Sequence, residues 1–202
     1  MNTPEQSGIA VSGWYGKLPS LGDFASRRLP PTFIEPWDAW LSQVLDASRR
    51  RLGNDWLNAY LSCPVWRFVL APGALSPQCG WAGVMMASLD RVGRHFPLTV
   101  VAPVSALPAT PAALAGLWGW LSRIERDALD AIEFDHDIDG FDGALERAGL
   151  PPETSDPGPW AGRLAGCSLW VSVDRDPRLP FDFHTASGMP DCGEFAVMLT
   201  GR

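Results

Sequence analysis

The sequence has almost no lysine and no long apolar run. Lys17 is the one lysine, and the other fifteen basic residues of the 202-residue chain are arginines. No apolar stretch approaches the roughly 20 residues that a membrane-spanning helix needs. The first residues also lack the basic region and apolar core of a signal peptide. We therefore expect a cytoplasmic protein with no direct membrane insertion.

Several motifs that carry chemistry are also missing. The four cysteines form no C-x-x-C pair, which disfavours a zinc ribbon or a thioredoxin-like site, and we expect most of them to be buried, inert thiols. No G-x-S-x-G or H-E-x-x-H motif is present, so neither a serine hydrolase elbow nor a zinc protease helix is indicated. We expect no cofactor and no catalytic residues.

A basic stripe is absent too. The formal net charge is −7, and it is unevenly spread. Residues 1–101 carry nine basic and seven acidic groups, whereas residues 102–202 carry seven basic and sixteen acidic groups. Nucleic-acid binding depends on cations that displace counterions along a track, so this composition predicts no nucleic-acid partner.

Apolar residues are plentiful: they make up 46% of the chain, and ten of them are tryptophans. Their periodicity predicts blocks of helices between strands, which favours an α+β fold. We expect a flexible tail over 1–8 and a single domain over 9–202, with a central, largely antiparallel (mixed) sheet flanked by helices. Strands are predicted at 9–15, 65–70, 81–87, 97–104 and 167–173. Helices are predicted from 32 to Gly53 and over 55–61, 111–134 and 141–148, and 191–199 is either a strand or a helix.

The segment GWYGKLPSLGDF, residues 13–24, has glycines and a lysine, as a phosphate-binding loop does, but it lacks two of the residues that such a loop requires. A P-loop needs a first glycine, then Gly-Lys-Ser/Thr. Here Leu18 follows Lys17 where the hydroxyl should be, and Val11 stands where the first glycine should be. The glycines and the proline more simply predict a turn after the first strand.

An acidic segment, DHDIDGFDGALE, matches the spacing of a calcium-binding EF-hand loop. Asp142 stands where that motif is usually apolar, and no second loop pairs with it. A calcium loop and a solvated acidic turn are the two interpretations. The oxygen donors of the calcium loop would come from Asp135, Asp137, Asp139, Phe141 and Glu146.

A set of charged residues lies next to apolar strands, where charges usually need partners. An internal ion-pair network and a partner-binding surface both fit this pattern. Arginine suits either, because its planar fork makes paired hydrogen bonds. The partner-binding candidates are Lys17, Asp23, Arg27, Arg67, Asp90, Arg91 and Arg94.

Four motifs follow one another in a fixed order: GWYGKLPSLGDFASRRLP, FIEPWDAWL, LGNDWLNAYLSCPVWRFVLAPG and GVMMASLDRVGRHFPLTVVAP. Together they resemble the TagF family, also called ImpM, of type VI secretion-associated proteins. The resemblance implies a cytoplasmic accessory protein that represses the secretion machine after translation. It also implies a partner, an FHA-domain scaffold protein of that system, and it carries over no catalytic residue.

Two further hypotheses remain at this point. One is an enzyme, a hydrolase or a phosphate-acting protein, that uses the Asp/Arg/His cluster near 90–95. The other concerns the FHA partner, because FHA domains bind phosphothreonine. Thr110 and Thr154 lie in expected loops and are candidates for that modification.

Overall fold

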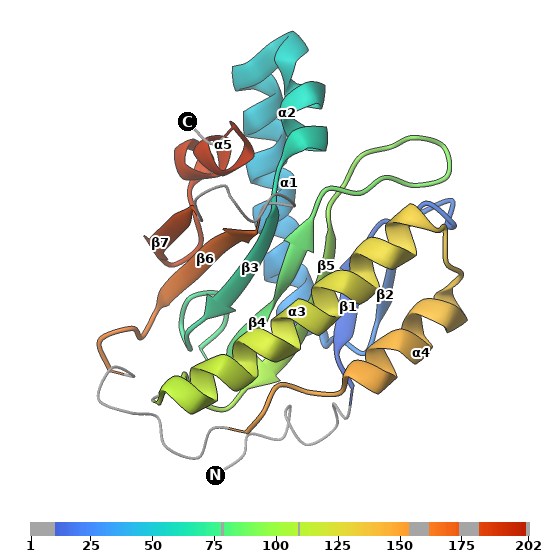
Figure 1. Cartoon of the computed structure of the whole chain (residues 1–202). Coiled ribbons are helices and arrows are strands. Elements are labelled where there is room, and N and C mark those ends of the chain that lie inside the picture. Colours follow the sequence, from blue (N-terminus) through green and yellow to red (C-terminus); the bar gives the residue numbers. More distant parts are fainter. Residues whose placement is uncertain (1–10, 78, 109, 154–161, 174–181, 201–202) are drawn as a thin grey trace.

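The computed structural model describes residues 11–77, 79–108, 110–153, 162–173 and 182–200, and it has the α+β architecture expected (Figure 1). One sheet of seven strands has the order β2-β1-β5-β4-β3-β6-β7, and every neighbouring pair is antiparallel. The expected tail at 1–8 lies outside the described residues. The strands are β1 (Gly13–Gly16), β2 (Ala25–Arg27), β3 (Val65–Leu70), β4 (Gly80–Met86), β5 (Leu98–Val104), β6 (Cys167–Val173) and β7 (Phe183–Ser187).

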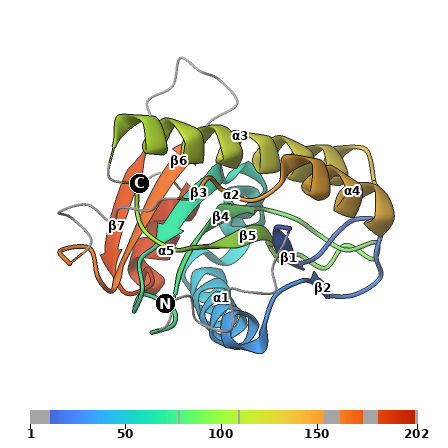
Figure 2. The same cartoon turned by 90° about the horizontal axis from the view of Figure 1, so that it is seen from below.

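Helices cover both faces of this sheet. Figure 2 shows α3 and α4 on one side of the sheet and α1 on the other. Helices α2 and α5 pack beside α1 and complete that layer. A short 3₁₀ turn, Gly53–Asp55, joins α1 to α2. The helices are α1 (Pro31–Leu52), α2 (Trp56–Ser62), α3 (Pro111–Glu133), α4 (Ile138–Ala148) and α5 (Cys192–Thr200).

The central strands are buried on both faces, and their side chains divide between two apolar cores. Successive side chains of a strand point to opposite faces, so Trp66 and Phe68 of β3 pack with α1 while Val65 packs with α3. Trp37 of α1 stacks near Phe68, with ring centroids 5.0 Å apart. The fold therefore has three layers, with a helical layer on each face of a sheet that is apolar on both sides.

The start of α1 differs from the prediction. The spacing of Thr32 and Glu35 predicts a capping box, but Pro30 occupies the N-cap position and no side chain caps the helix. Pro31 opens the helix instead, because its fixed φ suits the first helical position and its missing N–H would be unpaired there anyway. The other end is as predicted: Gly53, at φ 53°, ends α1.

The edge strands β2 and β7 were not predicted. Both are short and largely exposed, so they lack the apolar alternation on which the prediction rests. Strand β2 pairs with β1 in the register Gly16↔Ala25, so residues 17–24 form the connection of a hairpin. Gly16 has φ 133°, and a Cβ on it would lie 2.1 Å from the carbonyl oxygen of Pro97. The expected turn is therefore present, and Gly16 is the position that requires glycine.

No helix among the described residues is both long and apolar enough to cross a membrane. All four cysteines are free thiols. Burial raises the pKa of Cys63 to about 12, so this thiol stays protonated at neutral pH. That agrees with the expectation of an inert thiol at this position.

Candidate functional site

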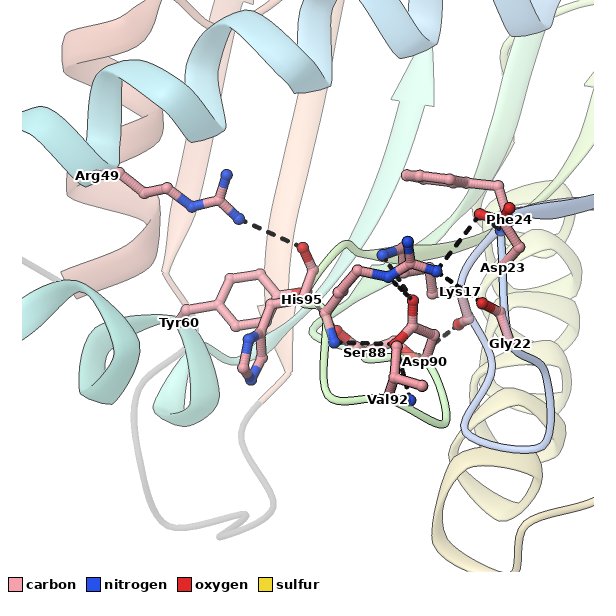
Figure 3. Close-up of polar contacts among 11 residues, drawn as sticks. Lys17, Gly22, Asp23, Phe24, Arg49, Tyr60, Ser88, Asp90, Val92 and His95 are labelled. Carbon is pink, nitrogen blue, oxygen red and sulfur yellow. Dashed lines mark hydrogen bonds and ion pairs between the residues drawn. The ribbon is translucent and has the colours of Figure 1, made fainter.

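A buried carboxylate organises the loop between β4 and β5. Asp90 is fully buried and accepts from Lys17 Nζ at 2.9 Å and from Arg94 Nε at 2.7 Å (Figure 3). Its second oxygen accepts from the backbone N–H groups of Val92, at 3.1 Å, and Arg94, at 2.9 Å. One carboxylate therefore fixes two cations and the turn that carries one of them.

This loop is tied to the elements on either side. Gly93, at φ 82°, lets the chain reverse between Asp90 and Arg94. The hydroxyl of Ser88 donates to the carbonyl oxygen of Lys17 at 2.7 Å. Tyr60 of α2 donates its hydroxyl to the Ser88 carbonyl at 2.8 Å and accepts from the Ser88 N–H at 3.0 Å. The loop is thus held in one conformation by β1 and α2.

The hydrogen bonds to Asp90 decide its ionisation state. Burial opposes the charged form, but it is outweighed by the donors. The Arg94 N–H, the Lys17 and Arg94 side chains and the Val92 N–H together hold the pKa of Asp90 well below its usual range. Asp90 is therefore a permanent counter-charge at physiological pH.

Above this carboxylate lies an open depression of about 450 Å³, which we call the cationic depression. It is formed by the residues after β1, one face of α1 and the end of the β4–β5 loop. Among the described residues no carboxylate lines it, and its charged members are all cationic. The lining residues are Lys17, Phe24, Ser42, Leu45, Arg49, Arg94, His95 and Phe96.

Arg49 projects from α1 and is held by an aromatic platform. Its guanidinium lies 4.3 Å from the ring centroid of Trp56 and donates to the carbonyl oxygen of His95 at 3.3 Å. The His95 ring meets the rings of Trp56 and Tyr60 edge-on, at 6.1 and 5.6 Å. Among the described residues, no carboxylate pairs with Arg49. Its charge is therefore ordered but not neutralised.

The opposite wall of the depression is aromatic. The Lys17 ammonium lies 4.7 Å from the ring centroid of Phe24, and Phe24 meets Phe96 edge-on at 4.7 Å. Phe24 nevertheless remains 45% exposed. Arg94 donates to the Gly22 carbonyl at 2.6 Å, which fixes its exposed guanidinium beside this wall. Exposed cationic and aromatic groups therefore share one preorganised surface.

Three of the predicted partner contacts are too buried for that role. Lys17, Asp90 and Arg67 are 4%, 0% and 7% exposed, and each is paired inside the molecule. For these three the prediction is corrected in favour of an internal ion-pair network, because burying a charge without a partner is costly. Asp23, Arg91 and Arg94 are exposed near the cationic depression, with Asp23 Oδ1 3.7 Å from Arg94.

Two predicted residues lie on the α3–α4 side, away from this depression. Arg67 donates to Glu125 of α3 at 2.6 Å, and its guanidinium lies 4.3 Å from the ring centroid of Trp118. Arg27 is half-exposed and lies 3.7 Å from Asp142 of α4. The predicted set is therefore divided between the two sides of the sheet.

The acidic segment is not an EF-hand loop. Residues 138–148 form α4, and Asp137 is the N-cap, its carboxylate accepting from the Gly140 N–H at 2.8 Å. Phe141 is buried in the core against Trp14, so it does not sit in an open ligand loop. No group of three potential metal ligands is found in the described part of the chain. The turn interpretation also needs correction, because most of the segment is helical.

Sequence reasoning missed most of the lining of the cationic depression. Arg49 is one of three arginines in the last turn of α1, where cations complement the helix dipole, so its position alone does not point to a site. A further signal was available: Ser42, Leu45 and Arg49 follow the spacing i, i+3, i+7 and so share one helix face. Which loop faces them could not be read from the sequence.

Comparison with known proteins agrees with the motifs. The TagF N-terminal domain, described as type VI secretion system-associated, matches residues 13–148. The crystal structure of PA0076 from Pseudomonas aeruginosa PAO1 is 36% identical and superposes with a TM-score of 0.80, covering 95% of this chain and 94% of the other. A comparison with curated proteins returned no match. The chain therefore belongs to the TagF family of type VI secretion system-associated proteins.

Proposed function

We propose that this chain is a cytoplasmic, post-translational repressor of the type VI secretion system, and that it acts by binding the FHA-domain scaffold component. Its place in the TagF family supports the secretion context. The observation that carries the binding role is the cationic depression, an exposed surface built on a fixed frame.

The composition of this surface suits a protein contact. Arginine and aromatic residues are enriched at the energetic centres of protein interfaces. Arg49 and Arg94 are already ordered, by Trp56 and by Asp90, before any partner arrives. Ordering side chains on binding costs free energy, so this preorganisation favours tighter association.

Catalysis by the cluster near 90–95 is less well supported. A general base needs a free carboxylate or imidazole within reach of a substrate proton. All the contacts of Asp90 are internal, its pKa is lowered, and it does not line the depression. Asp90 is therefore better suited to holding two cations in place than to moving a proton.

Affinity purification from a secretion-competent host tests the proposal. We expect the FHA-domain component to copurify with the tagged chain, and we expect its yield to fall for R49Q and R94Q. R126Q is the matched control, since Arg126 is an exposed arginine on α3, on the other side of the sheet. Recovery of other secretion components without any FHA-domain protein would overturn the proposed partner.

The repressor role has its own test. Deleting the gene should raise secretion, and the wild-type chain but not R49Q should restore the lower level. Among the candidate phosphorylation sites, Thr110 caps α3, its hydroxyl accepting from the Ala113 N–H at 3.2 Å, whereas Thr154 lies outside the described residues. T110A would lose this cap as well as the hydroxyl, so T154A is the cleaner test of a phosphate-dependent contact.

A further inference from the structure

The cationic depression is a positive site on a negative protein. The chain carries a formal charge of −7, yet the charged groups that line the depression are Lys17, Arg49 and Arg94. One buried carboxylate, Asp90, is shared between Lys17 and Arg94 and so offsets one of these three charges. Asp23 is 79% exposed and 3.7 Å from Arg94, so it offsets little in water.

Two carboxylates of α1 on this side already have partners of their own. Asp46 of α1 pairs with Arg50, and Asp38 accepts from the hydroxyl of Tyr15. Arg49 has one hydrogen bond among the described residues, to the His95 carbonyl, whereas a guanidinium has five N–H donors. Donors and uncompensated charge are therefore available together in a depression whose described lining contains no acid.

An exposed apolar surface adjoins these cations. Phe24 is 45% exposed, and with Phe96 it forms the wall opposite Arg49. A free inorganic anion would contact only the cationic side chains and not the aromatic wall. A peptide segment with an acidic group next to an apolar side chain would use both walls, and the open form of the depression admits a chain that enters and leaves.

We infer that the cationic depression binds an oxyanion, a carboxylate or a phosphate, carried by an extended segment of the partner protein. The oxyanion accepts from Arg49 and Arg94, and a neighbouring apolar side chain packs on Phe24. Charge-assisted hydrogen bonds to arginine are among the stronger polar contacts in proteins. This inference rests on the proposed function for the identity of the partner, but the anion site can be tested without it.

The direct test is an NMR titration of the purified, isotope-labelled full chain. The probes are inorganic phosphate, a short phosphothreonine–phenylalanine peptide and the matching glutamate–phenylalanine peptide, at constant ionic strength. We expect saturable shifts of the Arg49 and Arg94 Nε signals and of the backbone amides of 94–96. The two peptides distinguish a phosphate from a carboxylate source, and we expect the preferred peptide to bind more tightly than inorganic phosphate.

Matched variants locate the site. R49Q should weaken binding of the preferred peptide by about tenfold, the expected loss of one charge-assisted contact. R50Q is the control, because Arg50 is the next residue on α1 and pairs with Asp46. R49K, which keeps the charge and loses the planar fork, should fall between wild type and R49Q.

A second pair of variants does not depend on the packing of Arg49. Ser42 is exposed on α1, so S42E places a carboxylate in the depression and S42Q places a neutral side chain of similar size there. S42E should abolish the titration shifts, and S42Q should keep them. Failure of both peptides and phosphate to shift the 94–96 amides, or equal binding by S42E and S42Q, would overturn the inference.

The two proposals can fail separately. The anion site would be rejected, and the proposed function would stand, if R49Q and S42E captured the FHA-domain component at wild-type yield and no anion bound to the depression. Anion binding at the depression, with no FHA-domain protein captured by the wild-type chain, would reject the proposed partner and leave the anion site standing.

Discussion

At the scale of single residues, Asp90 explains most of the site. It is the buried counter-charge that orders Lys17 and Arg94, which both line the depression. Burial works against its ionisation, and four hydrogen bonds reverse that effect and lower its pKa. Its role is therefore electrostatic positioning of two cations rather than direct contact with a partner.

A pH series on D90N tests this role. A carboxylate whose pKa is lower in the folded state stabilises that state above its ordinary pKa of about 4, and the contribution is lost as the pH falls. We expect D90N to unfold at lower urea concentration than wild type at pH 7. The gap between the two should narrow as the pH falls below about 4, because the unfolded wild-type chain then takes up a proton at Asp90 that the folded chain still excludes.

Urea unfolding followed by circular dichroism measures the midpoints, with D55N as a control at an exposed position in the 3₁₀ turn. D55N should stay close to wild type across the series. A gap between wild type and D90N that does not change with pH would show that the ionised carboxylate is not what stabilises the loop.

At the scale of secondary-structure elements, close contact between β1 and the start of β5 brings Lys17 over Asp90. Gly16 makes that contact possible, because its φ of 133° suits glycine and a Cβ would meet the Pro97 carbonyl oxygen at 2.1 Å. The glycine in the opening segment is thus a packing requirement at the end of a strand and not part of a phosphate loop.

G16A should accordingly be strongly destabilising. Backbone strain and overpacking each cost about 1–3 kcal/mol, so we expect the free energy of unfolding to fall by about 3 kcal/mol or more. G119A is the contrasting variant: Gly119 lies inside α3, a Cβ there meets only the Arg123 side chain at 3.9 Å, and alanine favours helix. G119A should be neutral or stabilising. A loss smaller than about 1 kcal/mol for G16A would contradict the packing account.

The first turn of α4 gives an independent prediction. Asp137 caps this helix through the Gly140 N–H, so D137A should lower the free energy of unfolding by about 1 kcal/mol. E146A should change it little, because Glu146 is exposed on α4 and alanine favours helix. Millimolar calcium should leave the melting temperature of all three proteins unchanged. A rise with calcium that D137A abolishes would restore the EF-hand interpretation.

The helices and strands also show how much of the fold could be predicted from the sequence. The strands Val65–Leu70 and Cys167–Val173 were predicted to the residue, because their apolar runs end at clear turn signals. The helices α3 and α4 were found within a few residues. The edge strand β2 was not predicted, because its three polar or small residues show no apolar alternation. It becomes a strand only by pairing with β1.

The candidate site could be predicted only in part. Charges next to buried strands correctly drew attention to Lys17, Asp90 and Arg94. In the structure Lys17 and Asp90 are buried whereas Arg94 is exposed. The sequence pattern alone does not show which charged residues are buried. Arg49 lies 41 positions before Asp90 in the sequence, and only the packing of α1 on this side of the sheet brings it to the same depression.

At the scale of the whole molecule, the cationic depression and the most acidic helices lie on different sides of the sheet. The cationic depression lies on the α1 side, whereas α3 and α4, with many of the sixteen acidic groups of residues 102–202, lie on the other (Figure 2). An acidic segment of a partner would be attracted to the depression and repelled by the acidic helices, which orients the encounter. Added salt should therefore slow association more than it speeds dissociation.

The most direct test of the central claim is calorimetric titration of the purified chain with the purified FHA-domain component, comparing wild type, S42Q and S42E. We predict that wild type and S42Q bind with similar affinity and that S42E binds at least about tenfold more weakly, because its carboxylate occupies the place of the partner's oxyanion. Equal affinity for all three proteins would contradict the claim that the cationic depression is the docking site.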